Sequence, residues 1–281
     1  MILDGKTLSQ KILNDLKLKI GNLKIKPILD IIIVGTDSAS QKYVTLKQKK
    51  AQSVGIGGTV HQLDESSTNE DVLSLINKLN NDSNITALMV QLPLPSQIDT
   101  QKVLSAINPQ KDADGLNPFN LGLLFQKEST GIASATACGI IKLLEEYKVD
   151  VSGKNAVMVG RSSEVSIPLF ALLLGKNATV TVCHSYTENL KDICSKADIL
   201  ISAIGKPKFL TKDFVKGGAV VIDVGFGTDQ NGQISGDFDF SEVSKIAEFI
   251  TPVPGGVGPM TIASLLYNTV QIAKKNENNL L

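Results

Sequence analysis

The sequence predicts a two-domain α/β protein with parallel sheets, and three observations support this fold class. Six short, β-branched apolar segments alternate with stretches of helical periodicity. The segments are continuously apolar, as strands buried on both faces of a parallel sheet are. The 281 residues, 42% of them hydrophobic, suit one large or two ordinary domains, and a break rich in Pro, Gly, Asn and Asp at 108–122 marks the expected linker.

The individual elements follow from the same patterns. The expected strands cover 28–34, 86–92, 155–160, 178–183, 197–205 and 218–225. Several of the expected helices follow a Ser or Thr that can cap the first turn. These helices cover 7–20, 40–54, 69–80, 136–147 and 165–175. A second break, "TPVPGGVGPMT" at 251–261, precedes a last helical pattern that could return to the first domain.

Composition argues against several classes of function. Acids and bases balance at 28 each and the pI is near 6.7, so no polybasic face for nucleic acid or an anionic membrane is expected. Three cysteines without a C-x-x-C pair and only two histidines argue against a metal centre and for a reducing compartment. The N-terminus has an amphipathic helix pattern, and no apolar run approaches the roughly 20 residues of a membrane helix. We therefore expect a cytoplasmic protein with a small-molecule partner.

The segment "VMVGRSSEV" at 157–165 indicates a phosphate site. A buried strand ends at Gly160 and a helix follows, and the free N–H groups of a helix N-terminus can bind phosphate. The G-x-G-x-x-G fingerprint is absent, so an ordinary turn is the alternative. Arg161 is the single arginine among 28 basic residues, which favours a planar bidentate contact that lysine cannot make.

The nucleotide expected at this turn is NADP. After the next strand the chain reads "CHSYT" at 183–187, without the acid that an NAD-selective fold usually offers to the ribose. The absence of this acid favours a 2′-phosphate. A structural arginine that caps a carboxylate is the alternative.

A second candidate site lies in "SASQKYVTLKQKK" at 38–50. Tyr43 and Lys47 are four residues apart and therefore lie on one face of the expected helix. A solvated basic face with a half-buried tyrosine is the simpler interpretation. A Y-x-x-x-K pair also suggests a short-chain dehydrogenase, but there the pair follows a glycine-rich nucleotide loop, whereas here it precedes the nucleotide turn by over a hundred residues.

Three further stretches carry a family resemblance. They are "VQLPLP" at 90–95, "KDADGLNP" at 111–118 and "ITPVPGGVGPMT" at 250–261. In this order, together with the Tyr43/Lys47 pair and the G-R-S turn, they closely resemble the bifunctional methylenetetrahydrofolate dehydrogenase/methenyltetrahydrofolate cyclohydrolase family. The resemblance runs over essentially the whole chain, from "LDGK" at 3–6 to the final helical pattern.

The resemblance implies a fold, a cofactor and a set of site residues. It implies a catalytic folate-binding domain at 1–118 completed by a C-terminal helix at 259–281, and a Rossmann-like NADP-binding domain at 119–258, with the folate in the cleft between them. By position, Lys47 matches the catalytic lysine, Tyr43 the ring that covers the folate, Gln91 the polar partner of the lysine, and Asp114 the acid that anchors the pterin. The implied cofactor positions are Gly160, Arg161, Ser162, Ser185 and Phe226, and the implied folate loop includes Pro254, Gly255 and Gly256 and extends to Gly258.

The residue chemistry fits both reactions of the family. Oxidation of the methylene bridge sends a hydride to the nicotinamide and leaves a cationic amidinium, and water then attacks the same carbon to give the 10-formyl product. A lysine that is partly neutral near pH 7 can carry protons for the second step, and burial lowers its pKa in that direction. Asp114 suits the N–H donors of a pterin edge, whereas Asp112 is expected to be a turn or cap residue.

The chain also departs from the family pattern. Ser134 and Ala137 replace two prolines of the P-C-T-P-x-G motif, and Ser166 replaces the second glycine of G-R-S-x-x-V-G-x-P. These changes leave the residues around Lys47 untouched. Two alternatives to the bifunctional enzyme therefore remain: a monofunctional cyclohydrolase with a weakened cofactor site, and a folate- or nucleotide-binding protein without useful turnover. A homodimer is expected, as in the relatives.

Overall fold

The computed structural model describes residues 1–126 and 131–279, and they form two compact units. Unit 1 consists of Met1–Gln10 and Thr136–Thr261, and unit 2 of Lys11–Ala135 and Ile262–Leu281. Two long helices run from one unit into the other, α1 (Gly5–Gly21) and α10 (Val257–Asn279). The predicted domain boundaries at 118 and 258 remain a prediction.

Unit 2 contains a three-stranded parallel sheet. The strands are β1 (Leu29–Val34), β2 (Val60–Leu63) and β3 (Ala87–Val90), in the order β2-β1-β3. Ile31 of β1 lies opposite Val60 on one side and Met89 on the other. All residues of β1 and β3 are buried, which explains why both strands are continuously apolar.

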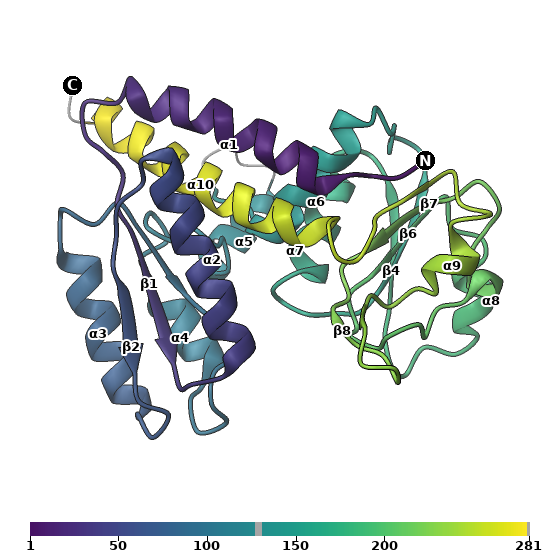
Figure 1. Ribbon diagram of the computed structural model, residues 1–281, viewed down its shortest axis with the longest axis horizontal. Helices are drawn as coiled ribbons and strands as arrows, with labels where there is room; N and C mark the ends of the chain where they lie inside the picture. The colour runs from purple at the N-terminus through teal and green to yellow at the C-terminus, as the bar shows by residue number, and fades with distance from the viewer. Residues whose placement is uncertain (127–130, 280–281) are drawn as a thin grey trace. The chain divides into compact units, whose positions relative to one another are not determined.

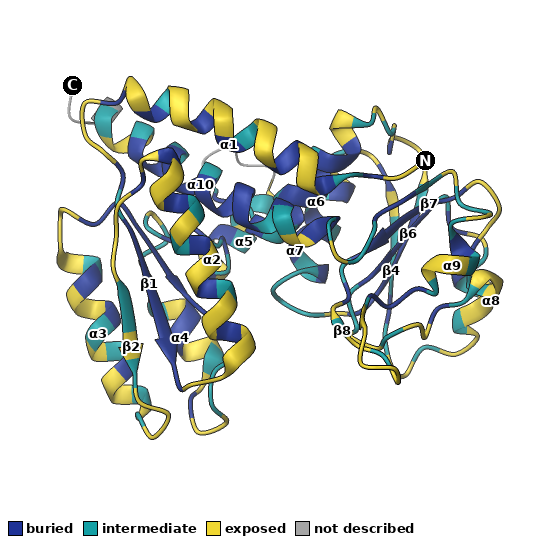
Figure 2. Cartoon of the chain, in the orientation of Figure 1, coloured by how far each residue is buried: buried dark blue, intermediate teal, exposed yellow. Residues whose placement is uncertain are grey.

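Helices cover both faces of this sheet (Figures 1 and 2). One face packs against α2 (Ser38–Val54) and against the parts of α1 and α10 that belong to unit 2. The other face packs against α3 (Asn69–Asn81) and α4 (Thr100–Ala106). The short helix α5 (Pro118–Phe125) follows, capped by the Asn117 side chain. Because successive side chains of a strand point to opposite faces of the sheet, every second residue of β1 and β3 faces α2.

Unit 1 contains a five-stranded parallel sheet in the order β10-β7-β6-β4-β5. The strands are β4 (Asn155–Val159), β5 (Thr179–Cys183), β6 (Ile199–Ser202), β7 (Val220–Asp223) and β10 (Phe249–Ile250). The chain passes from β4 to β5 on one side and then crosses to β6 on the other. In an open parallel sheet, such a reversal leaves a crevice at the carboxyl ends of the strands, where ligands bind.

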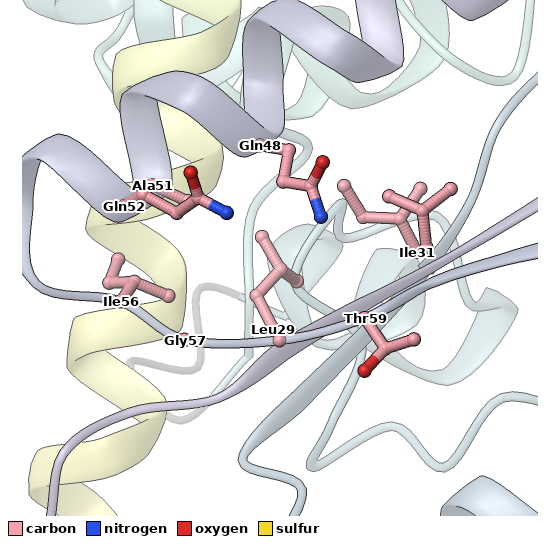
Figure 3. A pocket seen from close by; sticks show the side chains of 10 residues that line it. Leu29, Ile31, Gln48, Ala51, Gln52, Ile56, Gly57 and Thr59 are labelled. Carbon is pink, nitrogen blue, oxygen red and sulfur yellow. The ribbon is translucent and has the colours of Figure 1, made fainter.

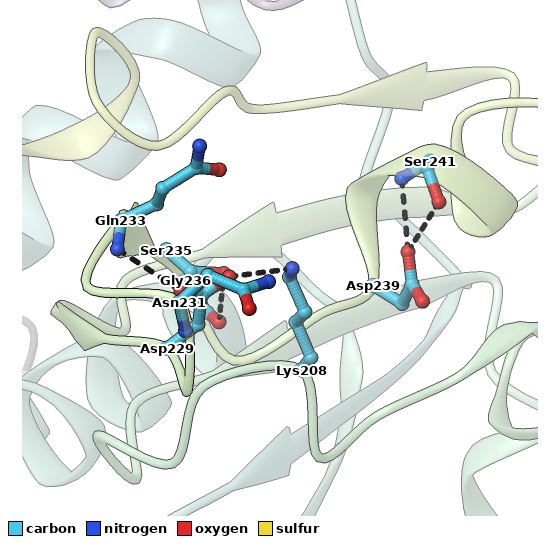
Figure 4. A network of polar contacts seen from close by, with 8 residues as sticks. All are labelled: Lys208, Asp229, Asn231, Gln233, Ser235, Gly236, Asp239 and Ser241. Atoms are coloured by element: carbon cyan, nitrogen blue, oxygen red, sulfur yellow. Dashed lines mark hydrogen bonds and ion pairs between the residues drawn. The ribbon is translucent and has the colours of Figure 1, made fainter.

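The remaining elements of unit 1 surround this sheet (Figure 1). They are α6 (Ala135–Glu146), α7 (Ser166–Gly175), α8 (Leu190–Cys194), a 3₁₀ turn η1 (Lys212–Phe214) and α9 (Phe240–Val243). Two short strands, β8 (Gly227–Thr228) and β9 (Ile234–Ser235), form a hairpin after β7. Figure 4 shows a polar network at this hairpin, in which the Lys208 ammonium lies 2.7 Å from an oxygen of Asp229.

The predicted fold class is confirmed. The six expected strands correspond to β1, β3, β4, β5, β6 and β7, and the last helical pattern corresponds to α10. The stretch 108–122, expected to be the linker, lies within unit 2, and its last part begins α5. No helix in the described parts of the chain is long and apolar enough to cross a membrane.

Candidate active site

Helix α2 places Tyr43 and Lys47 on its inner face. The Asp37 side chain caps the helix by accepting the Ser40 N–H at 2.8 Å, and Gly55 ends it in the left-handed region at φ 94°. The buried positions recur every three or four residues, and Lys47 is one of them, with 3% of its surface exposed. The interpretation of this segment as a solvated basic face therefore does not apply to Lys47.

The Lys47 ammonium is surrounded by three side chains. Its Nζ donates to Oε1 of Gln91 at 3.0 Å and lies 3.6 Å from the sulfur of Met89. It also lies 4.6 Å from the centre of the Tyr43 ring, within the range of a cation–π contact. The structure thus brings together Lys47, Tyr43 and Gln91, which the resemblance assigns to catalysis.

Burial lowers the pKa of Lys47, because the ammonium has left water, and the nearby Asp114 carboxylate opposes this change. Gln91 also donates from its own amide to the Leu92 carbonyl, at 2.6 Å, so its oxygen is directed at the lysine. A neutral amide can orient the amine without adding a charge that would hold its proton.

Asp112 and Asp114 have different environments. Asp112 is 1% exposed and accepts hydrogen bonds from the backbone of Gly115 and Asn117 and from the Asn120 side chain. Burial raises its pKa to about 6. It therefore holds the turn, as the sequence predicts. Asp114 is partly exposed, and its charge is close enough to influence both Asp112 and Lys47.

The turn after β4 holds the predicted residues Gly160, Arg161 and Ser162. Gly160 has φ 123°, and a Cβ at this position would lie 2.9 Å from the carbonyl oxygen of Ala203, which follows β6. Glycine is thus required where the loops after β4 and β6 meet, at the crevice that the strand order creates. The Ser162 hydroxyl accepts the Val165 N–H at 3.2 Å and closes the turn.

The Arg161 guanidinium is exposed and lies over the ring of Tyr186, 5.7 Å from its centre. Tyr186 follows β5 and also meets His184 edge-on at 6.2 Å. Ser185, the predicted cofactor residue of this loop, lies between His184 and Tyr186 in the sequence and is exposed. Phe226, after β7, is 65% exposed. All predicted cofactor residues therefore follow the carboxyl ends of strands in one parallel sheet.

The predicted folate loop of Pro254, Gly255 and Gly256 follows β10. The Gly255 carbonyl accepts the Lys6 N–H at 2.9 Å, and the Gly256 N–H donates to the Pro252 carbonyl at 2.8 Å. A side chain at position 256 would lie 2.6 Å from that same carbonyl oxygen. Pro254 is exposed.

A small pocket beside α2 is a poor candidate for substrate binding (Figure 3). It lies between α2 and the strands β1 and β2, lined by residues such as Gln48, Gln52, Leu29 and Thr59. Its volume is about 10 Å³, which is room for about one water molecule. Among residues 1–126 and 131–279, no group of three or more His, Cys, Asp or Glu could hold a metal ion.

Sequence reasoning missed two residues of these sites. Met89 is two residues before Gln91, so period-two alternation directs both side chains toward α2, and this signal could have identified it. Tyr186 lies within "CHSYT", but only the three-dimensional structure shows that it meets the single arginine.

The chain matches two models of one family over most of its length. The tetrahydrofolate dehydrogenase/cyclohydrolase catalytic domain matches residues 3–114, and the NAD(P)-binding domain of the same family matches residues 134–277. The chain therefore belongs to the tetrahydrofolate dehydrogenase/cyclohydrolase family.

Individual relatives are similar over nearly their full length. A bifunctional protein FolD from Campylobacter curvus is 49% identical over 282 residues, covering 99% of this chain and 98% of the relative. The crystal structure of FolD from Campylobacter jejuni has a TM-score of 0.96 at 45% identity, covering 98% of this chain and 99% of the other. A Trypanosoma brucei enzyme, complexed with NADP and an inhibitor, has a TM-score of 0.94 at 37% identity, covering 99% and 98%.

These matches confirm the predicted enzyme class, a bifunctional folate dehydrogenase and cyclohydrolase with an NAD(P)-binding domain. They also confirm the prediction of NADP as cofactor. A monofunctional cyclohydrolase is not favoured.

Proposed function

We propose that this chain oxidises 5,10-methylenetetrahydrofolate with NADP and hydrolyses the methenyl product to 10-formyltetrahydrofolate, with Lys47 as the proton carrier. The observation that carries this proposal is the buried ammonium of Lys47, which lies between the Tyr43 ring and the Gln91 carbonyl oxygen. Buried lysines with a lowered pKa are typical of catalytic sites.

The hydrolysis requires the movement of protons at one carbon. A neutral Lys47 amine can take a proton from the water that attacks the methenyl carbon, and the resulting ammonium can return it to the leaving nitrogen. Gln91 holds the amine in place from one side. The Tyr43 ring lies beside the amine and offers a flat surface to a bound pterin.

Asp114 is the proposed anchor of the pterin. An ionised carboxylate accepts two hydrogen bonds side by side, which matches an N–H next to an amino group on a pterin edge. Its charge also stabilises the protonated form of Lys47, so Asp114 and burial act on the amine in opposite directions.

The loop after β4 supports the proposed NADP site. The glycine at position 160 lets the turn after β4 approach Ala203 in the loop after β6, and Arg161 presents an exposed guanidinium for the 2′-phosphate. Bound NADP supplies the hydride acceptor. Ser162, Ser185 and Phe226 are proposed to line the same edge, and the similar Trypanosoma brucei enzyme binds NADP.

The test is an absorbance assay with purified protein. NADP and methylenetetrahydrofolate should yield a methenyl band that then decays, and Lys47→Met should slow this decay toward its rate in buffer. Methenyl that accumulates with the unsubstituted chain would favour a dehydrogenase alone, and binding without any absorbance change would favour a binding protein.

We also propose that the chain is a cytoplasmic homodimer. The support is the sequence composition and the family resemblance, together with three free cysteines, Cys138, Cys183 and Cys194. Light scattering of the purified chain should give twice the mass of one chain, and a single-chain mass would contradict the proposal. Cell fractionation tests the location.

A further inference from the structure

Two buried carboxylates lie at the carboxyl edge of the five-stranded sheet and have no role in the chemistry above. Asp223 is the last residue of β7 and is 4% exposed. Asp237 comes two residues after β9 and is fully buried. Buried carboxylates are rare unless they are paired or hydrogen-bonded, so the partners of these two indicate what they hold in place.

Asp237 holds the loop that follows β6. Its Oδ1 accepts the backbone N–H of Lys206 at 2.7 Å. Its Oδ2 accepts the N–H of Ile204 at 2.8 Å and the hydroxyl of Ser202 at 2.7 Å. Ala203 lies within this loop, and its carbonyl oxygen is the atom that a Cβ at Gly160 would meet. Asp237 therefore holds the residues on both sides of Ala203, which lies close to the predicted cofactor turn.

Asp223 binds both ends of the segment 225–238, which follows β7. Its Oδ1 accepts the N–H groups of Gly225 at 3.0 Å and Asp237 at 2.9 Å. Its Oδ2 accepts the N–H of Phe238 at 3.0 Å. This segment contains the β8–β9 hairpin, which is drawn in Figure 4, and the predicted cofactor residue Phe226.

Two glycines let the carboxylates approach the backbone. A Cβ at Gly225 would overlap the carboxylate of Asp237, and a Cβ at Gly236 would overlap that of Asp223. The Asp237 carboxylate therefore packs against Gly225, whose N–H donates to Asp223, and the Asp223 carboxylate packs against Gly236, the residue before Asp237. This reciprocal packing makes the two acids one structural unit, which we call the carboxylate pair.

The carboxylate pair also reaches the loop after β10. The backbone N–H of Asp223 donates to the Thr251 hydroxyl at 2.7 Å, and Thr251 is fully buried. Thr251 begins the loop that contains Pro254 and Gly255. This bond uses the backbone of Asp223, so it joins the loop after β10 to the end of β7, whereas the two carboxylates themselves hold the loops after β6 and β7.

We propose that Asp223 and Asp237 are positioning residues for the cofactor, which hold the loops after β6 and β7 in the arrangement that binds NADP. This inference rests on the proposed binding of NADP by the predicted cofactor residues, which we call the Gly160 edge: Gly160, Arg161, Ser162, Ser185 and Phe226. Neither acid is expected to touch the reacting atoms. Loss of either should weaken NADP binding and leave hydrolysis at Lys47 unchanged, because Lys47 and its partners belong to the other unit.

The test compares two activities of one variant. Asp237→Asn replaces one carboxylate oxygen by an amino group, which cannot accept a backbone N–H. Because charge-assisted hydrogen bonds are lost, the KM for NADP should rise about tenfold. Hydrolysis of methenyltetrahydrofolate without cofactor should stay within about twofold, since that step does not use this edge.

The matched control is Asp198→Asn. Asp198 precedes β6 at the opposite edge of the same sheet, where its carboxylate accepts the Asn155 N–H at 2.9 Å and pairs with Lys216 at 2.7 Å. Asp198→Asn therefore removes a hydrogen-bonded carboxylate from the same unit, although a more exposed one than Asp237. Its KM for NADP should remain that of the unsubstituted chain.

Two results would overturn the inference. One is an unchanged KM for NADP in Asp237→Asn, and the other is an equal loss of both activities in Asp237→Asn that is folded by circular dichroism. If Asp237→Asn does not fold, Ser202→Ala decides instead, because it removes only one hydroxyl donor to Asp237 and should raise the KM about twofold to fivefold. An unsubstituted chain that does not reduce NADP would contradict the proposed function itself.

Discussion

Lys47 is unusual because its charged end is almost completely buried. Transfer of an ammonium out of water is costly, and a buried lysine responds by losing its proton more easily. Here the atoms next to the ammonium include a carbonyl oxygen, a sulfur and an aromatic face, which are uncharged, while the nearby Asp114 carboxylate favours the protonated form. These contacts tolerate both the ammonium and the neutral amine, which is what a proton carrier needs.

Removal of the amine tests this role. Lys47→Met keeps the length and the apolar stem of the side chain but removes the proton carrier, so the cyclohydrolase rate should fall by about 10²–10⁴. NADP binding should remain. The control is Lys49→Met, an exposed lysine on the same helix, which should hydrolyse methenyltetrahydrofolate normally. Hydrolysis by Lys47→Met at the rate of the control would rule out the role.

The single arginine tests cofactor selectivity. Arg161→Lys replaces a planar fork with a point charge and removes the contact over Tyr186, so NADP binding should weaken by about 1–3 kcal/mol. NAD binding should barely change, because NAD has no 2′-phosphate. Titration of both dinucleotides measures the difference, and equal losses would show that Arg161 holds the turn or the pyrophosphate instead.

The two candidate sites differ in how well a sequence can reveal them. Lys47 and Tyr43 share a helix, so their proximity follows from their spacing, and Gln91 follows from the family motif. The carboxylate pair has no such signal. Asp223 and Asp237 are separated by a hairpin, and their contact depends on how the loops after β6 and β7 close on each other. Spacing predicts contacts within an element, whereas contacts between loops depend on tertiary packing.

At the scale of elements, the longer buried strands were predictable and the short ones were not. Strand β2 is only four residues long, reads "VHQL" and has no fully buried residue, so it lacks the apolar run that marks its neighbours. Strand β10 has two residues. Both acquire their conformation by pairing with a neighbouring strand, β1 or β7, and local sequence carries little of that information.

A substitution in the first turn of α7 tests how NADP binds at the Gly160 edge. Ser166 is the first residue of α7 and is 2% exposed, and its hydroxyl would be 3.3 Å from a Cβ at Gly160. The side chain therefore occupies space beside the turn where backbone and phosphate should meet. Ser166→Gly should improve NADP binding by about 1 kcal/mol and lower the KM several-fold, with hydrolysis unchanged. Weaker NADP binding in this variant would instead identify Ser166 as a phosphate ligand.

The end of β7 offers a test by pH. Burial raises the pKa of Asp223 to about 7 from 3.8, so the folded chain keeps a proton that the unfolded chain has lost. The free energy of unfolding should therefore fall as pH rises from about 4 to about 7. Asp223→Asn removes this titration. Chemical denaturation at about pH 5 and about pH 8 should show a smaller decrease for the variant, and parallel decreases would contradict the assignment.

At the scale of the whole molecule, the two units carry different parts of the chemistry. The Lys47 cluster and Asp114 belong to unit 2, whereas the Gly160 edge, the carboxylate pair and the Pro254 loop belong to unit 1. The family models divide the chain in a similar way, with a catalytic match at 3–114 and an NAD(P)-binding match at 134–277. Substitutions in one unit should therefore affect one activity more than the other.

The most direct test of this account is one absorbance time course with the unsubstituted chain, NADP and methylenetetrahydrofolate. We predict that a methenyl band appears only when NADP is present, and that it then decays faster than in buffer because the same chain hydrolyses it. A methenyl band that persists as long as in buffer, or no band at all, would show that this chain does not catalyse both steps.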